Sequence, residues 1–235
     1  MKLLCLSTAE SGCSLAIIDG TSLVCEEFWE DRLTHSKRLL RMIEHLVENR
    51  AGMELSDIDV FAAANGPGSF TGLRIGISVV KGLAYAMGKP AVGVSSLDGI
   101  GFRFVHSSVP VSVMMDARRN EVYCAVYCFD HGRLVSKSRE RVVSPEDAIE
   151  MTDSDVLFAG SGSKVYKDII KQNVGNPKFA DNFMDHVSAA ALVRTLYSKE
   201  EFMNNPENFF AKNHISPNYI RKSDAQLQFA EKQEC

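Results

Sequence analysis

The stretch that decides the fold runs VFAAANGPGSFTGLRIGISVVKGLAYAMGKPAVGV, residues 60–94. It opens with an apolar run, Val60 to Ala64, that is typical of a buried strand, and it closes with another, Ala91 to Val94. Between the two, a Gly-Pro-Gly turn at Gly66 precedes a segment of helical length, Gly72 to Met87. The stretch therefore predicts a strand-helix-strand unit with parallel strands and a right-handed crossover.

The sequence before this unit predicts an antiparallel meander followed by a helix. Apolar runs bounded by turn residues predict three strands, Leu3 to Thr8, Cys13 to Asp19 and Leu23 to Glu30. The helix is expected from about His35 to Asn49, with Thr34 as its N-cap. Three antiparallel strands that lead into a parallel crossover are the layout of a ribonuclease-H-like lobe.

The second half of the chain repeats this layout. Its predicted elements are a hairpin of Val111 to Met115 and Val122 to Phe129, a third strand near Leu134 to Val142, a helix capped by Ser144, a strand Val156 to Ala159, and a last helix of roughly Ala189 to Met203 capped by Ser188. Two such lobes in tandem predict an α/β protein with the actin-like ATPase fold of the ASKHA superfamily. We expect a first lobe at residues 1–107, a smaller second lobe at 108–222 whose last helix packs back on the first, and a mobile tail at 223–235.

Composition and charge argue against two classes of protein. The 235 residues are 45% hydrophobic and 24% charged, an ordinary globular balance, and no apolar run approaches the length of about 18 residues that a membrane span needs. We therefore expect a cytoplasmic protein without a membrane partner. The net charge is −4 and the basic residues are scattered, whereas a protein that binds nucleic acid by itself usually carries a basic stripe. A partner would have to supply most of any contact with RNA.

The helix after the Gly-Pro-Gly turn is unusually poor in charge. Between Gly72 and Met87 only Arg74 and Lys81 are charged, and their spacing places them on one face. A surface helix is normally polar over about half of its circumference, so this one is either buried in its lobe or offers its outer face to another protein. The glycines would let a second helix approach closely. The candidate contact residues are Gly72, Leu73, Gly76, Ile77, Val80, Leu83 and Ala84.

The Gly-Pro-Gly turn also has the form of a loop that could bind phosphate. Thr71 is placed to cap a helix starting at Gly72, and free backbone amides at a helix start can hold an anion. The turn lacks the lysine of a Walker motif and the spacing of a dinucleotide fingerprint. On physical grounds a purely structural turn is favoured.

Five segments, in order and at matching spacing, carry a family resemblance: LLCLSTAESGCSLAI at Leu3 to Ile17, HSKRLL at His35 to Leu40, GPGSFTGLRIG at Gly66 to Gly76, MDARRNEVY at Met115 to Tyr123, and PNYIRK at Pro217 to Lys222. With them the chain resembles the bacterial TsaB family, also called YeaZ, over residues 1 to about 222. The resemblance implies the two-lobed fold and a role in making threonylcarbamoyladenosine in tRNA, as a non-catalytic partner of the catalytic subunit TsaD. It further implies pairing through the N-terminal lobe, assembly with the ATPase TsaE, and contact with tRNA only through the complex. Apart from the resemblance, the apolar face of the same helix allows a homodimer where the partner is absent, and the sequence does not choose between the two states.

Residues that a metal or nucleotide site of related proteins would need are replaced in this chain. Ser96 and Ile100 stand where a TsaD-like protein carries the two histidines of a metal site, and neither a hydroxyl nor an alkyl group replaces an imidazole ligand. Ser7 stands where actin-like kinases carry an aspartate that positions Mg²⁺. We therefore expect no catalytic residue and no metal in this chain, and no cofactor that the chain requires, while the complex leaves room for ATP or ADP.

Two weaker candidate sites complete the prediction. Thr8, Ser11 and Gly12, together with Gly160 and Gly162 before Tyr166, lie where such folds hold a nucleotide, although a Gly-rich turn is as often structural. Asp116, Arg118 and Glu121 form a charged cluster in the second-lobe hairpin. That cluster is either an ion-paired hairpin or a contact with the partner or tRNA.

Two enzyme classes remain as alternatives to a partner subunit. A small-molecule phosphotransferase or ATPase of the actin-like fold needs an acidic group at the phosphates, and Ser7 removes it. A TsaD-type metallopeptidase needs the histidine pair, which Ser96 and Ile100 remove. A partner subunit needs only the fold and a surface, so it is the favoured interpretation.

Overall fold

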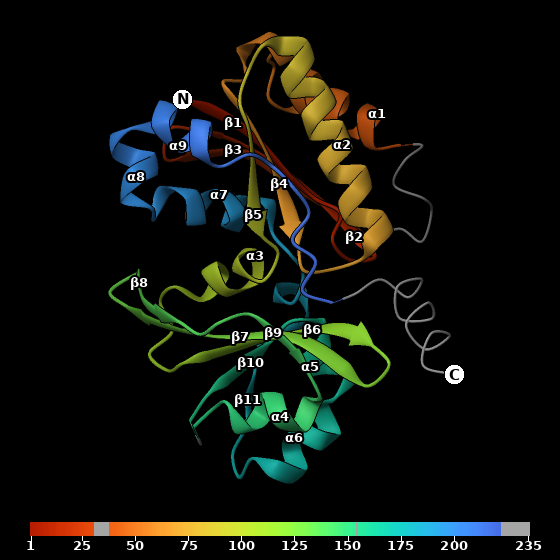
Figure 1. The fold of residues 1–235 in the computed structure, drawn as a ribbon, viewed down its shortest axis with the longest axis vertical. Helices are drawn as coiled ribbons and strands as arrows, with labels where there is room; N and C mark the ends of the chain where they lie inside the picture. Colours follow the sequence, from red (N-terminus) through yellow and green to blue (C-terminus); the bar gives the residue numbers. More distant parts are fainter. Residues whose placement is uncertain (31–37, 154, 222–235) are drawn as a thin grey trace, which may run out of the picture.

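The chain forms two mixed β-sheets stacked one above the other, each flanked by helices (Figure 1). The structure is a computed structural model, and it describes residues 1–30, 38–153 and 155–221. Among these residues, no helix combines the length and the apolar character that a membrane crossing needs.

The first sheet has the strand order β3-β2-β1-β4-β5. Its strands are β1 (Lys2–Ser7), β2 (Gly12–Asp19), β3 (Ser22–Glu30), β4 (Val60–Gly66) and β5 (Ala91–Ser95). The first three are antiparallel, while β4 pairs parallel with both β1 and β5. The predicted meander and crossover unit are confirmed.

The second sheet repeats this topology, with the order β11-β10-β6-β7-β8 and β9 paired to β7. Its strands are β6 (Val111–Arg118), β7 (Glu121–Asp130), β8 (Arg133–Lys137), β9 (Arg141–Val143), β10 (Leu157–Ala159) and β11 (Lys178–Phe179). In both sheets an antiparallel meander is extended by parallel strands, so the predicted pair of ribonuclease-H-like lobes is confirmed.

The single strand predicted from Leu134 to Val142 is wrong, because β8 and β9 are separate strands that both pair with β7. The Ser138 hydroxyl accepts a hydrogen bond from the backbone N–H of Val126 at 2.9 Å. This side-chain contact replaces a regular ladder bond, and the chain leaves the sheet before it returns as β9.

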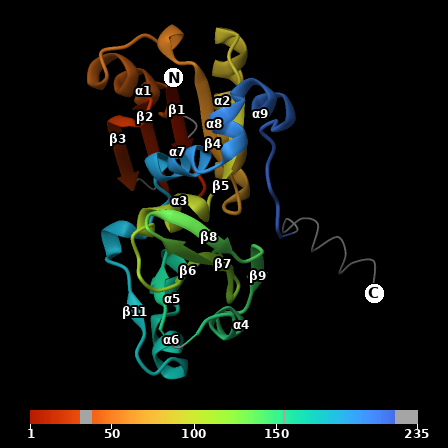
Figure 2. The same ribbon diagram turned by 90° about the vertical axis from the view of Figure 1, so that its left-hand side faces the viewer.

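Helices cover both faces of the first sheet, as Figures 1 and 2 show. α1 (Leu39–Glu44), its continuation η2 (His45–Arg50) and α2 (Phe70–Met87) lie on one side. α7 (Ala189–Tyr197), α8 (Glu200–Asn204) and α9 (Pro206–Lys212) lie on the other. The predicted cap Thr34 lies outside the described residues. The remaining short helices are η3 (Leu55–Asp57), α3 (Asp98–Gly101), η4 (Phe102–Phe104), α4 (Pro145–Glu150), α5 (Ser161–Val165), α6 (Lys167–Asn173) and η5 (Asn182–Met184).

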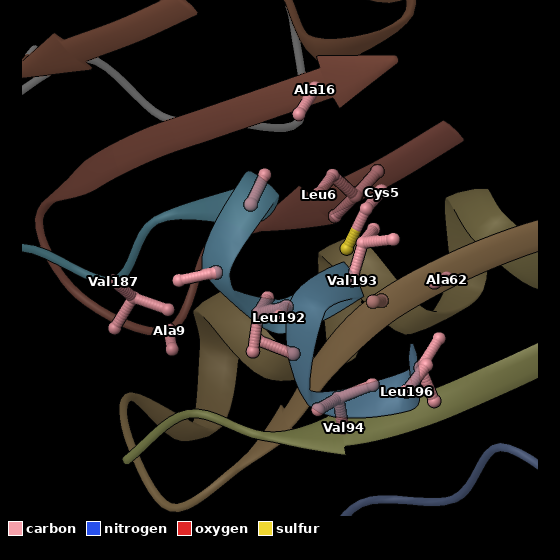
Figure 3. Packing of buried hydrophobic residues seen from close by; sticks show 14 of the residues in the cluster. Cys5, Leu6, Ala9, Ala16, Ala62, Val94, Val187, Leu192, Val193 and Leu196 are labelled. Atoms are coloured by element: carbon pink, nitrogen blue, oxygen red, sulfur yellow. The ribbon is translucent and has the colours of Figure 1, made fainter. Parts of the chain in front are cut away.

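The core of the first lobe lies on both faces of its sheet, against α1, η2 and α2 on one side and against α7 on the other. Figure 3 shows the side chains of α7 directed toward the sheet, among Cys5, Ala62 and Val94. Ser188 caps α7 as predicted, since its hydroxyl accepts a hydrogen bond from the N–H of Ala191 at 3.1 Å. The helix ends at Tyr197 rather than at Met203.

The early end of α7 has a local cause. The Ser198 hydroxyl donates to the carbonyl of Thr195 at 2.7 Å, and Lys199 adopts an extended backbone. The chain then turns so that Phe202 can pack edge-on against Tyr197 and Phe209. Burial of this aromatic cluster outweighs continuation of the helix.

α2 packs directly on β1 because glycines occupy its inner face. A methyl group at Gly72 would lie 2.0 Å from the carbonyl oxygen of Thr8, and one at Gly76 would lie 2.4 Å from the Thr8 hydroxyl. The two glycines therefore serve the approach of α2 to its own sheet, and not the approach of another helix as expected. The helix begins at Phe70, two residues earlier than predicted, and its cap is Ser69 rather than Thr71, because the Ser69 hydroxyl accepts from the N–H of Gly72.

The last described segment, residues 213–221, runs from α9 in the first lobe down to the second sheet (Figure 1). The N–H of Asn218 donates to the carbonyl of Asn65 at 2.7 Å, at the end of β4. The Arg221 guanidinium donates to the carbonyl of Ala117 at 2.6 Å, in β6. The segment thus contacts both lobes.

Candidate interaction face and interlobe cleft

The outward face of α2 is exposed along the length of the helix and carries Tyr85. Tyr85 is 90% exposed, the highest value among the exposed large hydrophobic side chains of the described residues. Around it the exposed positions of the helix are polar or small: Thr71, Arg74, Ser78, Lys81, Gly82 and Ala86. Ile75 and Val79 are half-buried beside them. This face carries one large aromatic side chain and two well-separated cations, a composition that suits a protein contact.

The predicted contact residues of this helix require a correction. Six of the seven are buried within the chain: Gly72, Leu73, Gly76, Ile77, Val80 and Ala84. Leu83 is half-buried. These residues point inward because they fill the space against β1 and β4, so their side chains are not available to a partner in this structure.

Tyr85 is not among the predicted contact residues, although the sequence indicates its position on the outer face of the helix. Arg74, Ser78, Lys81 and Tyr85 follow one another at spacings of three and four positions, which places them in one helical row. Arg74 and Lys81 were already known to share a face, and extending their row by one turn leads to Tyr85. The side of the sheet that carries α2 also carries α1 (Figure 1), whose Leu40 is 57% exposed.

A cleft of about 300 Å³ lies between the two lobes. The end of β1, the following turn and the start of β2 contribute Ser7, Glu10, Ser11 and Gly12, while the second lobe contributes Ser161, Lys164 and Asp185. Of the predicted nucleotide contacts, Ser11 and Gly12 line the cleft.

The other predicted nucleotide contacts do not line this cleft. Thr8 is buried and donates its hydroxyl hydrogen to the carbonyl of Gly72 at 2.7 Å. The N–H of Gly160 is held by the Asp185 carboxylate at 2.8 Å. Gly162 is buried close to the backbone of Met114. The three residues therefore hold the fold together around the cleft.

Two carboxyl groups, those of Glu10 and Asp185, line this cleft together with the Lys164 ammonium. Glu10 accepts a hydrogen bond from the Ser161 hydroxyl at 2.5 Å, across the gap between the lobes. Asp185 is 4% exposed and lies 3.5 Å from the Lys164 ammonium. Burial raises the pKa of Glu10 to about 7, against the lowering effect of the Ser161 hydrogen bond, and burial also raises the pKa of Asp185. Burial thus disfavours the ionised form of both carboxyl groups, which lie beside the Lys164 ammonium.

The raised pKa of Glu10 leads to a prediction about pH. A carboxyl whose folded-state pKa is about 7, above its ordinary 4.5, is favoured in its protonated form, so it costs stability as pH rises from about 4.5 to 7. Glu10→Gln removes that cost. We expect the variant to gain about 2 kcal/mol relative to the wild type between pH 5 and pH 8, a value reduced for the partial exposure of the side chain. Urea unfolding at both pH values measures the gain.

Ser161→Ala is the companion variant, because it removes the hydroxyl that stabilises the ionised Glu10. It should lose more stability at pH 8 than at pH 5. An offset between Glu10→Gln and the wild type that is the same at both pH values would contradict the prediction.

The second-lobe hairpin is shaped by left-handed backbone and by the C-terminal segment. Arg118, Arg119 and Asn120 all have positive φ angles, between 54° and 60°. The N–H of Arg118 donates to the Asp116 carboxylate at 2.8 Å. Glu121 pairs with the guanidinium of Arg221 at 3.2 Å. Glu121 therefore anchors the C-terminal segment, while Arg118 is exposed and its contact with partner or tRNA stays a prediction.

The two positions compared with a histidine pair are both part of the core. Ser96 and Ile100 are fully buried, and the Ser96 hydroxyl has no hydrogen-bond partner. Within residues 1–30, 38–153 and 155–221, no group of three or more His, Cys, Asp or Glu side chains converges in a way that could hold a metal ion.

Comparisons of sequence and of structure find similar proteins among those named for the synthesis of threonylcarbamoyladenosine in tRNA. The sequence model of the family described as TsaD, tRNA N6-adenosine threonylcarbamoyltransferase, matches residues 32–229. The tRNA threonylcarbamoyladenosine biosynthesis protein TsaB of Bacillus subtilis is 27% identical over 99% of this chain and 100% of its own length. TsaB of Escherichia coli is 33% identical over 74% of this chain and 77% of its own length. A solved structure of YeaZ from Pseudomonas aeruginosa is 31% identical, with a TM-score of 0.75 over 93% of this chain and 99% of that one.

Proposed function

The chain belongs to the TsaB family of tRNA threonylcarbamoyladenosine biosynthesis proteins, and we propose that it serves this pathway as a non-catalytic subunit that binds and supports a TsaD-like catalytic subunit. No cofactor of its own is part of the proposal, and ATP or ADP would enter with the other components. A TsaE-like ATPase would join the complex, and tRNA would be contacted through it.

The observation that carries the proposal is the division of α2 into two faces. Its inner face is filled by the chain's own sheet, while its outer face presents Tyr85 at 90% exposure on a rigid helix of 18 residues. An exposed aromatic side chain on a rigid element is a typical anchor of a protein interface, since little side-chain entropy is lost when it is buried. The same face would close a homodimer in the absence of the partner.

A non-catalytic role is supported by the groups that line the interlobe cleft. Ser7 supplies a hydroxyl where phosphate chemistry needs a carboxylate for Mg²⁺, and its hydroxyl lies 3.4 Å from the N–H of Ala9. The two carboxyl groups of the cleft are engaged within the chain: Glu10 accepts from the Ser161 hydroxyl, and Asp185 accepts from the N–H of Gly160 and faces the Lys164 ammonium. Neither carboxyl group is therefore free to hold Mg²⁺ at a phosphate, as a phosphotransferase would require.

Reconstitution tests the proposal directly. A TsaD-like protein and a TsaE-like ATPase from the same host, supplied with the activated threonylcarbamoyl donor and unmodified tRNA, should form the modified nucleoside only when this chain is added. Modified nucleoside is measured by mass spectrometry of digested tRNA. The chain alone with ATP and Mg²⁺ should release no phosphate. Full activity without the chain, or ATP hydrolysis by the purified chain that Ser7→Ala abolishes, would refute the non-catalytic role.

A further inference from the structure

A lysine lies half-buried between two carboxylates where the lobes meet. The ammonium of Lys137, the last residue of β8, lies 2.5 Å from an oxygen of Asp98 and 2.7 Å from an oxygen of Glu140. The Asp98 side chain is 10% exposed, that of Glu140 14%, and that of Lys137 23%. Because so little water reaches the three charges, their attraction is screened far less than in a surface ion pair.

The groups around Lys137 come from both lobes. Ser95 ends β5, a strand of the first sheet, and Asp98 begins α3 directly after it. Tyr127 of β7 belongs to the second sheet and donates its hydroxyl hydrogen to Asp98 at 2.8 Å. The Ser95 hydroxyl in turn donates to Glu140. Hydrogen bonds and ion pairs therefore cross the seam between the lobes in both directions.

The charge of Lys137 is maintained at this position. Burial by itself would lower the pKa of Lys137, but the neighbouring Asp98 and Glu140 raise it above the ordinary value. The ammonium is thus present at every physiological pH. Removing it would leave two nearly buried carboxylates facing each other without a counter-charge, which is far more costly than losing an exposed pair.

Hydrogen bonds and an ion pair also join other described parts of the chain across the seam. Ser161 of the second lobe donates to Glu10 of the first. Arg221, at the end of the segment that descends from α9, contacts Ala117 and Glu121 in the second lobe. A hinge motion rotates two domains about one axis. Contacts at three separate places oppose rotation about an axis that passes through any one of them.

We propose that Lys137 is an internal cation that holds the two lobes at a fixed angle, so that the chain acts as one rigid body rather than as a hinged pair of lobes. The cation occupies the seam permanently because it belongs to the chain. The first lobe, with the outer face of α2, and the second lobe would then move together when a partner binds. This inference concerns motion within the chain, so it can fail while the proposed function stands.

Hydrogen exchange of the intact chain, followed by mass spectrometry, tests the inference. Lys137→Met keeps an unbranched side chain and removes the charge. We expect exchange of the α3 amides, at the seam, to become at least about tenfold faster, and to accelerate by a larger factor than exchange of β1 and β6 in the sheet centres, while Tm falls by about 5 °C or more. The matched control is Lys178→Met, because Lys178 forms a pair of equal length, 2.5 Å, with Asp155 inside the second lobe, where both side chains are about half exposed or more. It should leave α3 exchange unchanged.

A second variant keeps the test decisive if Lys137→Met does not fold. Glu140→Gln removes one charge, still accepts the hydrogen bond of Ser95, and leaves Lys137 paired with Asp98. It should fold and should accelerate α3 exchange by a smaller factor than Lys137→Met. Wild-type exchange at α3 in a folded Lys137→Met or Glu140→Gln variant would overturn the proposal. Acceleration confined to β8 would also overturn it, since that would show a role within one lobe only.

Discussion

Replacing Gly72 with alanine is expected to lower the free energy of unfolding by about 3 kcal/mol, even though alanine is the better helix former. The added methyl group would lie 2.0 Å from the carbonyl oxygen of Thr8, a distance that real contacts do not reach. That oxygen belongs to the backbone directly after β1, at the centre of the first sheet, so it cannot move aside as a side chain could. α2 would have to shift away from the sheet and loosen the contacts of Leu73 and Val80. Urea unfolding followed by circular dichroism measures the loss.

Gly82→Ala is the matched control on the same helix. A methyl group at Gly82 meets no atom within 4 Å, so alanine there should gain about 0.5 to 1 kcal/mol through helix propensity alone. Both substitutions replace glycine by alanine in the same helix, and they differ only in the atoms that the added methyl group meets. Equal stability of the two variants would show that α2 is not seated on β1 as the structure has it.

This contrast explains why one expectation about α2 had to be corrected. Two glycines four positions apart predict a close approach to something, and the sequence alone cannot say whether that is a second helix or the helix's own sheet. The answer depends on Thr8, which lies 64 residues away from Gly72 in the chain and contacts it only in the folded lobe. Periodicity, in contrast, is local information, and it placed the strand-helix-strand unit correctly.

Errors in element bounds have a similar origin. The strand expected from Leu134 to Val142 is interrupted because Ser138 bonds to Val126, and α7 ends at Tyr197 because an aromatic cluster forms beyond it. Both causes are tertiary contacts that local propensity does not encode. The same holds for the cleft, since Glu10 and Ser161 are 151 residues apart. Tyr85 is different, because its place in a helical row was available from the sequence.

The row that contains Tyr85 supports the prediction with the largest expected effect on function. Tyr85→Asp should weaken co-purification with the TsaD-like partner by about tenfold or more and lower the modified nucleoside in tRNA, because a charge replaces the exposed aromatic anchor of the proposed interface. The fold should be unaffected, since a side chain that is 90% exposed contributes little to stability. Co-expression, affinity purification and nucleoside analysis in cells that lack the native chain measure both effects.

Val135→Asp is the control for this experiment. Val135 is also an exposed hydrophobic residue, at 66%, but it lies on β8 in the second lobe, away from α2. It should leave both partner binding and modified nucleoside at wild-type levels. If the chain alone forms a dimer through α2, Tyr85→Asp should also make it monomeric, while Val135→Asp should not. A folded Tyr85→Asp variant that binds the partner as the wild type does would place the interface elsewhere. α2 would then serve the fold alone, through the packing of Gly72, Gly76 and Val80 against the sheet, and its outer face would have no part in partner binding.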